Sequence, residues 1–155
     1  MKTIHQWLQE YGESHQNPRN VFIHKICVPL IMFTVLGICW SVPKPSWFEG
    51  IWFMNWSTLV AVLALSYYAF LSRKLALGML FEVIIMFKIL HLMELNMLFP
   101  VWATSLILFA IAWVLQFIGH NIEGKRPSFF KDLQFLLIGP LWTLNFFYKK
   151  WGIKV

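Results

Sequence analysis

Long apolar runs divide the chain and constrain its fold more than any other feature. They cover residues 21–40, 51–71, 75–95 and 101–118, and each approaches the roughly 20 apolar residues with which a helix crosses a bilayer core. Only 13% of all residues are charged and 59% are hydrophobic, whereas an average soluble domain has about 25% charged residues. The chain is therefore predicted to be an integral membrane protein, and a soluble domain, a disordered segment and a coiled coil are excluded as its class.

The N-terminal residues 3–14 have the pattern of an amphipathic helix. Its apolar residues recur at helical spacing: Ile4, Trp7, Leu8 and Tyr11. Such a helix lies in the membrane interface. We expect Asn17-Pro18 to end it, because the residue before a proline avoids the α region.

The last apolar stretch, residues 129–148, is interrupted by Gly139-Pro140. If it crossed the membrane, Lys149, Lys150 and Lys154 would lie opposite most other basic residues, against the positive-inside rule. We therefore expect a re-entrant or interfacial helix pair broken at Gly139-Pro140. The predicted fold is one membrane-embedded domain over residues 1–155. It is an all-α integral membrane helical bundle with about four transmembrane helices, an N-terminal amphipathic helix and this C-terminal pair.

The net charge of +6 comes mainly from basic residues in the short segments between the apolar runs. With the N-terminus and the polar loop 119–128 on the cytoplasmic side, nearly all of these residues lie on or near that side, and Lys44 lies opposite. Lys25 lies one turn inside the first run and can extend back to the surface. This distribution follows the positive-inside rule and suits anionic lipid headgroups, so no nucleic-acid partner is expected. A bacterial inner membrane and the endoplasmic reticulum both fit.

Three of the five histidines are expected at one membrane face. His15 and His24 flank the Asn17-Pro18 break, and His120 follows the fourth apolar run, so the predicted topology brings them to the same side. Other polar residues accompany them at helical spacing: Tyr11 with His15, Asn20 with His24, and Gln116 and Glu123 with His120. Because unsatisfied polar groups are costly inside hydrocarbon, this arrangement indicates a function.

Two interpretations of these histidines follow from the residues alone. Imidazole groups bind zinc, copper, iron or nickel, and carboxylate or amide neighbours orient the rings. Alternatively, the histidines bind lipid headgroups or cap helices. Cys27 and Cys39 both lie within the first run and are interpreted as packing residues, so a structural zinc site is not expected. A metal site would be mononuclear, or dinuclear and poor in histidine.

A second polar group lies in the third run, where Lys88, His91 and Glu94 share one helix face. Ionisable residues inside a membrane often mark a functional pathway, so a small proton-coupled transporter using these three residues is an alternative function. A self-satisfied pair of Lys88 and Glu94 explains the pattern nearly as well. A non-enzymatic membrane adaptor is a further alternative, which explains the hydrophobicity but not three histidines at one face.

Three motifs resemble the signatures of a known membrane protein family. The first consists of Tyr11, His15, Asn17-Pro18, Asn20, His24 and Pro29. The second is Gln116-Phe117-Ile118-Gly119-His120, followed by Glu123 and Lys125-Arg126-Pro127, and the third is Ile138-Gly139-Pro140-Leu141. In order and content they are similar to the motifs of the iron(II)-dependent 2-hydroxy fatty acid dioxygenases. Cys27 stands where glycine is common in that family, and His91 belongs to none of the motifs.

The resemblance implies α-oxidation, in which a 2-hydroxy fatty acid and O2 give a fatty acid one carbon shorter, CO2 and water. The decarboxylation releases as many electrons as the reduction of O2 to water consumes, so no NAD, flavin, haem or 2-oxoglutarate is required. The implied cofactor is Fe(II), bound by His15, His24 and His120.

The resemblance also suggests roles for the surrounding polar residues. The candidates for binding the substrate carboxylate are the basic residues Arg19, Lys25 and Arg126. The candidates for acid–base chemistry or for orienting the ligands are Tyr11, Asn20, Gln116 and Glu123. Neither the oligomeric state nor the length of the substrate chain is implied.

Overall fold

The computed structural model describes residues 2–48, 50–96, 98–124 and 129–155, and most of these residues form helices. These residues contain no strand, which confirms the predicted all-α class. The elements are α1 (Ile4–Gly12), α2 (Pro18–Trp40), the short 3-10 helix η1 (Ser46–Phe48), α3 (Trp56–Leu71), α4 (Arg73–Asn96), α5 (Val101–Glu123) and α6 (Phe129–Lys150).

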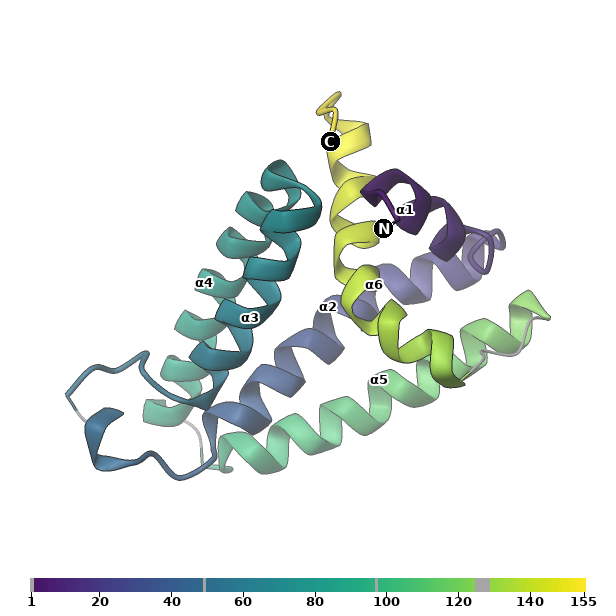
Figure 1. Cartoon of the computed structure of the whole chain (residues 1–155). Helices are drawn as coiled ribbons and strands as arrows, with labels where there is room; N and C mark the ends of the chain where they lie inside the picture. Colours follow the sequence, from purple (N-terminus) through teal and green to yellow (C-terminus); the bar gives the residue numbers. More distant parts are fainter. Residues whose placement is uncertain (1, 49, 97, 125–128) are drawn as a thin grey trace.

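The helices pack as two antiparallel pairs with α6 between them (Figure 1). α2 packs along α5 over most of its length, and α3 packs along α4. α2 and α3 meet near the end of α2, where the Ser57 hydroxyl donates to the Leu36 carbonyl. From that junction the two helices diverge, and α6 packs against α1, α2 and α4.

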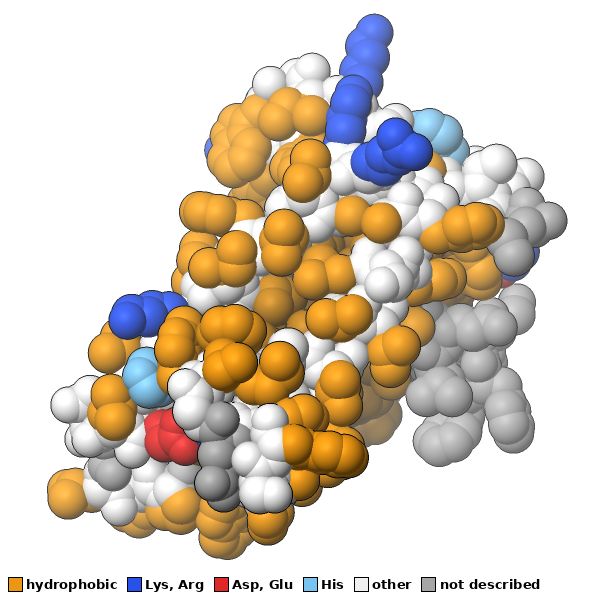
Figure 2. Space-filling view, turned by 60° about the vertical axis from the view of Figure 1, so that its left-hand side comes forward, with side chains coloured by type: hydrophobic (Ala, Val, Ile, Leu, Met, Phe, Trp, Pro, Cys, Tyr) orange, Lys and Arg blue, Asp and Glu red, His pale blue; other side chains and the backbone are white. Residues whose placement is uncertain are grey.

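Three helices, α2, α4 and α5, are long and apolar enough to cross a membrane. The second apolar run begins its helix later than predicted, at Trp56 rather than at residue 51, because the Asn55 side chain accepts a hydrogen bond from the Thr58 amide and caps α3 there. The resulting 16 residues give a helix about 24 Å long, which is shorter than a hydrocarbon core of about 30 Å. Figure 2 shows the hydrophobic side chains that cover one face of the molecule.

The predicted loop 119–128 begins too early, since α5 continues to Glu123. Gly124 caps the end of α5, and its φ of 72° is the left-handed conformation that glycine adopts without strain. The extra turn places His120 and Glu123 on a regular helix. The rest of that predicted loop, residues 125–128, lies outside the described residues.

The C-terminal stretch is one helix, and the prediction of two helices broken at Gly139-Pro140 is wrong. A proline lacks the N–H for one helical hydrogen bond and bends a helix without necessarily ending it. The Thr143 hydroxyl donates to the Gly139 carbonyl beside the proline, and the α6 ribbon changes direction along its length in Figure 1.

The end of α6 returns to the turn between α3 and α4. The Tyr148 hydroxyl donates to the Lys74 carbonyl at 3.1 Å, and the Lys74 ammonium donates to the Lys154 carbonyl at 2.6 Å. The C-terminal lysines therefore lie at the same end of the molecule as Arg73 and Lys74, as the charge pattern predicts. Figure 2 shows basic side chains gathered at this end.

Candidate metal centre

Three histidines from separate parts of the chain converge at one place. His15 lies in the link between α1 and α2, His24 lies in α2, and His120 lies near the end of α5. One ligand atom from each ring lies within 4.8 Å of the others. The ring centroids are 4.3 Å apart for His15 and His24, 5.5 Å for His15 and His120, and 4.8 Å for His24 and His120. The predicted meeting of these three residues is what the structure shows.

Backbone carbonyl groups orient two of the three rings. The Nδ1 atom of His15 lies 2.7 Å from the Tyr11 carbonyl oxygen, and that of His24 lies 3.1 Å from the Asn20 carbonyl oxygen. Because a carbonyl oxygen only accepts, Nδ1 must carry the proton in both rings, which leaves a lone pair on Nε2. In metal-binding histidines, one ring nitrogen binds the metal and the other typically donates its N–H to a group such as a backbone carbonyl.

The chemical state of His15 suits metal binding. The residue is 7% exposed, and its buried Nε2 atom has no hydrogen-bond partner among the described residues. The pKa of His15 is lowered to about 4, mainly by burial and also by neighbouring His120, while the Tyr11 carbonyl and Glu123 oppose the shift. The ring is therefore neutral near pH 7, and its buried Nε2 atom has a free lone pair, which is the state in which an imidazole can bind a metal ion.

Glu123 connects two segments of the site. It lies on α5, as His120 does, and it binds the segment between α1 and α2, which contains His15. Its carboxylate accepts hydrogen bonds from the backbone amides of Gln16 and Asn17, each at 2.9 Å. It also accepts one from the side-chain amide of Asn20 at 3.0 Å. We call this set of contacts the Glu123 clamp. The sequence predicts Glu123 and Asn20 as candidates for acid–base chemistry or for orienting the ligands, and these contacts connect both residues to the segments that carry the histidines.

Gly119 allows the clamp to form. A Cβ atom at this position would lie 2.4 Å from the Asn20 side-chain oxygen and 3.5 Å from the His24 ring. Asn20 itself is fully buried and also donates to the Ser14 carbonyl at 3.2 Å. The absence of a side chain at Gly119 therefore lets α5 approach α2 closely enough to bring His120 to His24.

Aromatic rings from α1 and α6 cover the remaining side of His15. Tyr11 stacks on it with ring centroids 4.3 Å apart and an interplanar angle of 3°. Trp142 approaches both rings, at 5.3 Å from each. Trp142 is missing from the predicted site, although it directly follows the Ile138–Leu141 motif. The structure thus shows how this third motif belongs to the site.

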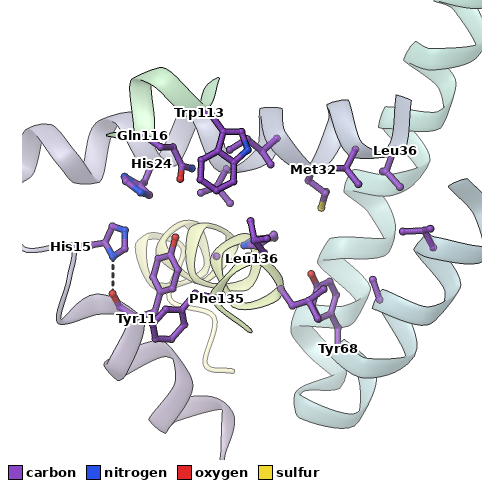
Figure 3. Close-up of a pocket in the computed structure, with 18 of the residues that line it drawn as sticks. Tyr11, His15, His24, Met32, Leu36, Tyr68, Trp113, Gln116, Phe135 and Leu136 are labelled. Atoms are coloured by element: carbon purple, nitrogen blue, oxygen red, sulfur yellow. Dashed lines mark hydrogen bonds between the residues drawn. The ribbon is translucent and has the colours of Figure 1, made fainter. Parts of the chain in front are cut away.

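An apolar cavity of about 360 Å³ extends from the histidines. Figure 3 shows His15 and His24 at one end, Met32, Leu36 and Tyr68 at the other, and Leu136 between them. Its polar lining includes the predicted residues Tyr11 and Gln116, together with Ser14, and Tyr68 adds a hydroxyl group at the end away from the histidines. A cavity of this size lies in the range of small-molecule sites, and its apolar extension suits a hydrocarbon chain.

The predicted carboxylate-binding cations do not reach this cavity among the described residues. Arg19 is exposed, and the Lys25 ammonium lies 3.1 Å from the ring centroid of Phe146. Each is the sequence neighbour of an inward-facing residue, Asn20 or His24, and adjacent helical residues point about 100° apart. Arg126, the third candidate, lies outside the described residues.

The polar group in α4 forms contacts that join helices. The Trp40 indole N–H donates to the Glu94 carboxylate at 3.1 Å, and His91 lies 3.8 Å from the same carboxylate. The His91 ring packs on Trp52 with centroids 4.9 Å apart, and Lys88 is exposed. These contacts connect α4 to α2 and to the segment before α3, so they favour a structural interpretation over the transporter alternative.

Comparison with known proteins agrees with the geometry. The family model described as 2-hydroxy-palmitic acid dioxygenase Mpo1-like matches residues 1–151. The 2-hydroxy-palmitic acid dioxygenase MPO1 of Saccharomyces cerevisiae is 31% identical over 146 residues, which cover 92% of this chain and 78% of the yeast protein. No solved structure matches the chain. The chain belongs to the 2-hydroxy-palmitic acid dioxygenase Mpo1-like family.

Proposed function

We propose that this protein is a membrane-bound, iron(II)-dependent dioxygenase for the α-oxidation of 2-hydroxy fatty acids. Family membership and the name of the yeast relative support a role in 2-hydroxy fatty acid metabolism. The observation that carries the proposal is the convergence of three imidazole rings at the end of an apolar cavity. The reaction balances as R–CHOH–COOH plus O2 giving R–COOH, CO2 and H2O.

The three histidines would hold the iron. Imidazole nitrogen is a suitable ligand for iron, and the orphaned Nε2 of His15 supports a metal in this position. Bound iron(II) would supply the redox chemistry with O2 that amino-acid side chains lack. The Glu123 clamp and the Tyr11 ring keep the ligands in position before the substrate arrives.

The cavity would bind the substrate with its carboxyl end at the histidines and its tail along the apolar wall. Gln116 lies one helical turn before His120 and lines the cavity, so its amide can donate to the substrate carboxylate or 2-hydroxyl group. A non-enzymatic adaptor needs neither the histidine cluster nor the cavity.

Metal removal and replacement test this function. We expect chelation to abolish conversion of a 2-hydroxy fatty acid by the full chain in detergent, and Fe(II) but not Zn(II) to restore it, because Zn(II) has no redox chemistry. The shortened fatty acid is measured by mass spectrometry. Undiminished turnover after complete removal of the metal, or equal restoration by Zn(II), would contradict the proposal.

Substitution of Gln116 tests the assignment of the carboxyl end. Gln116→Leu removes a polar group from the cavity while keeping a similar volume, and we expect KM to rise roughly tenfold, the effect of losing a hydrogen bond of about 1.4 kcal/mol to a charged group. Arg19→Ala is the matched control, because this side chain is exposed and does not line the described cavity. A large rise in KM for Arg19→Ala, with none for Gln116→Leu, would reverse the assignment.

A further inference from the structure

The cavity approaches the outer surface of the bundle at the end away from the histidines. There it lies between α2 and α3, just beyond the junction made by Ser57 and Leu36. Five of its lining residues are exposed. Three of them belong to α5 and α6, namely Phe117, Leu136 and Leu137, and the two at this end are Val35 of α2 at 37% and Val60 of α3 at 38%. Their neighbours Leu36 and Ala61, which also line the cavity, are each 4% exposed. The cavity thus reaches the apolar surface of the bundle at Val35 and Val60.

The path from the histidines to this opening is apolar. Along α2 it passes the lining residues Val28, Ile31 and Met32 before it reaches Val35. From His24 to Val35 the helix rises by about 17 Å, which is close to half of a hydrocarbon core about 30 Å thick. A tail that follows this path would end among lipid tails, because both exposed residues at the opening are apolar. Val35 lies in α2, which is long and apolar enough to cross a membrane, and Val60 lies in the shorter apolar helix α3.

We infer that the site is an open-ended channel, so that the tail of a long substrate leaves the protein between α2 and α3 and continues into the bilayer. This inference rests on the proposed function for the identity of the substrate. It deepens that function by defining the substrate class: long-chain and very-long-chain 2-hydroxy acids are accepted alike. Methylene groups beyond Val35 and Val60 lie among lipid tails whether or not the substrate is bound. They therefore contribute little to the free energy of binding.

Ala64 is the residue that keeps the path wide on the α3 side. It lines the cavity one helical turn from Val60 and one turn from Tyr68. Ala64→Phe would place a ring in the path and convert the open channel into a closed one. Ala69→Phe is the matched control, because Ala69 lies on the same helix, is exposed and does not line the described cavity.

The first test compares kcat/KM for medium-chain, long-chain and very-long-chain 2-hydroxy acids in lipid nanodiscs, with each substrate expressed as a fraction of the lipid. For the unaltered protein we expect long-chain and very-long-chain acids to agree within roughly twofold. Ala64→Phe is expected to lower kcat/KM of both by more than about tenfold, an effect of at least about 1.4 kcal/mol, while the medium-chain acid is retained. A sharp decline from long to very long chains in the unaltered protein would overturn the inference, and so would equal effects of Ala64→Phe and Ala69→Phe.

A second measurement needs no turnover and therefore separates this inference from the proposed function. A long-chain fatty acid with a diazirine near its methyl end is photolysed with the unaltered chain in nanodiscs, and the labelled residues are identified by mass spectrometry. We expect labels around Val35 and Val60. Labels confined to the interior at Tyr68 would show a closed cavity, and labels at Phe117 and Leu136 would show a different exit. Absence of turnover for every acid, with labels at Val35 and Val60, would reject the proposed reaction and retain the channel.

Discussion

Replacing His15, His24 or His120 with alanine is expected to abolish both iron binding and conversion of 2-hydroxy fatty acids. Among the described residues, each ring contributes one of the three ligand atoms that lie within 4.8 Å of one another, so each loss leaves two. We expect iron affinity to fall by more than the roughly 10–100-fold that loss of a supporting residue costs. Iron is measured per purified chain by atomic emission, and activity is measured by formation of the shortened acid.

His5 provides the matched control for these substitutions. It is an exposed histidine on α1 and does not belong to the convergent group, so His5→Ala should retain full iron content and activity. Where alanine at a buried position impairs folding, His15→Gln and His24→Gln keep more of the side-chain volume. Iron content that stays at the unaltered level in all three histidine variants would show that the metal lies elsewhere.

Glu123→Ala is expected to lower iron affinity by about 10–100-fold, although Glu123 does not belong to the ligand group. The substitution leaves the amides of Gln16 and Asn17 without their acceptor and frees the link that carries His15. Iron affinity by competition with a chelator is the informative measurement, because activity with saturating Fe(II) should largely recover if the residue only positions the ligands. Failure of saturating Fe(II) to restore activity would instead support the predicted acid–base role.

Glu123→Gln and Glu10→Gln complete this comparison. A glutamine amide offers one acceptor oxygen, whereas the carboxylate uses both of its oxygens. The iron affinity of Glu123→Gln is therefore expected to lie between that of the unaltered protein and that of Glu123→Ala. Glu10 pairs with Lys2 in an exposed contact, and such pairs contribute little, so Glu10→Gln should leave iron affinity unchanged. Equal affinities for Glu123→Ala and Glu10→Gln would show that the clamp does not position His15.

The histidine cluster was predictable from the sequence because its residues follow local rules. Asn17 caps α2 with a hydrogen bond to the Arg19 amide, which turns the chain between His15 and His24. Helical spacing then places Asn20 beneath His24. His15 follows α1 in a turn that stacks its ring on Tyr11, and the order of apolar runs brings the end of α5 to the same face. Family membership confirms the resemblance, whereas the role of the histidines and the identity of the metal stay predictions.

Other features depend on contacts between distant segments, which local patterns do not contain. Pro140 suggested a break, yet α6 continues because its neighbours α1, α2 and α4 support it on both sides of the bend. Trp142 joins the site only because α6 returns beneath α1. Lys25 was assigned to the substrate from its nearness in sequence to His24, but it faces Phe146. The cavity itself arises from the divergence of α2 and α3, which no sequence pattern indicates.

The most direct test of the central claim is the stoichiometry of the reaction catalysed by the full, Fe(II)-loaded chain. O2 consumption is followed with an electrode while CO2 and the shortened fatty acid are quantified in the same sample, without NADH, flavin or 2-oxoglutarate. Iron-dependent α-oxidation at the histidine cluster predicts equal amounts of O2 consumed, CO2 released and shortened acid formed, and none of the three with His120→Ala. Formation of the shortened acid without O2 uptake, or only with an added reductant or 2-oxoglutarate, would contradict it.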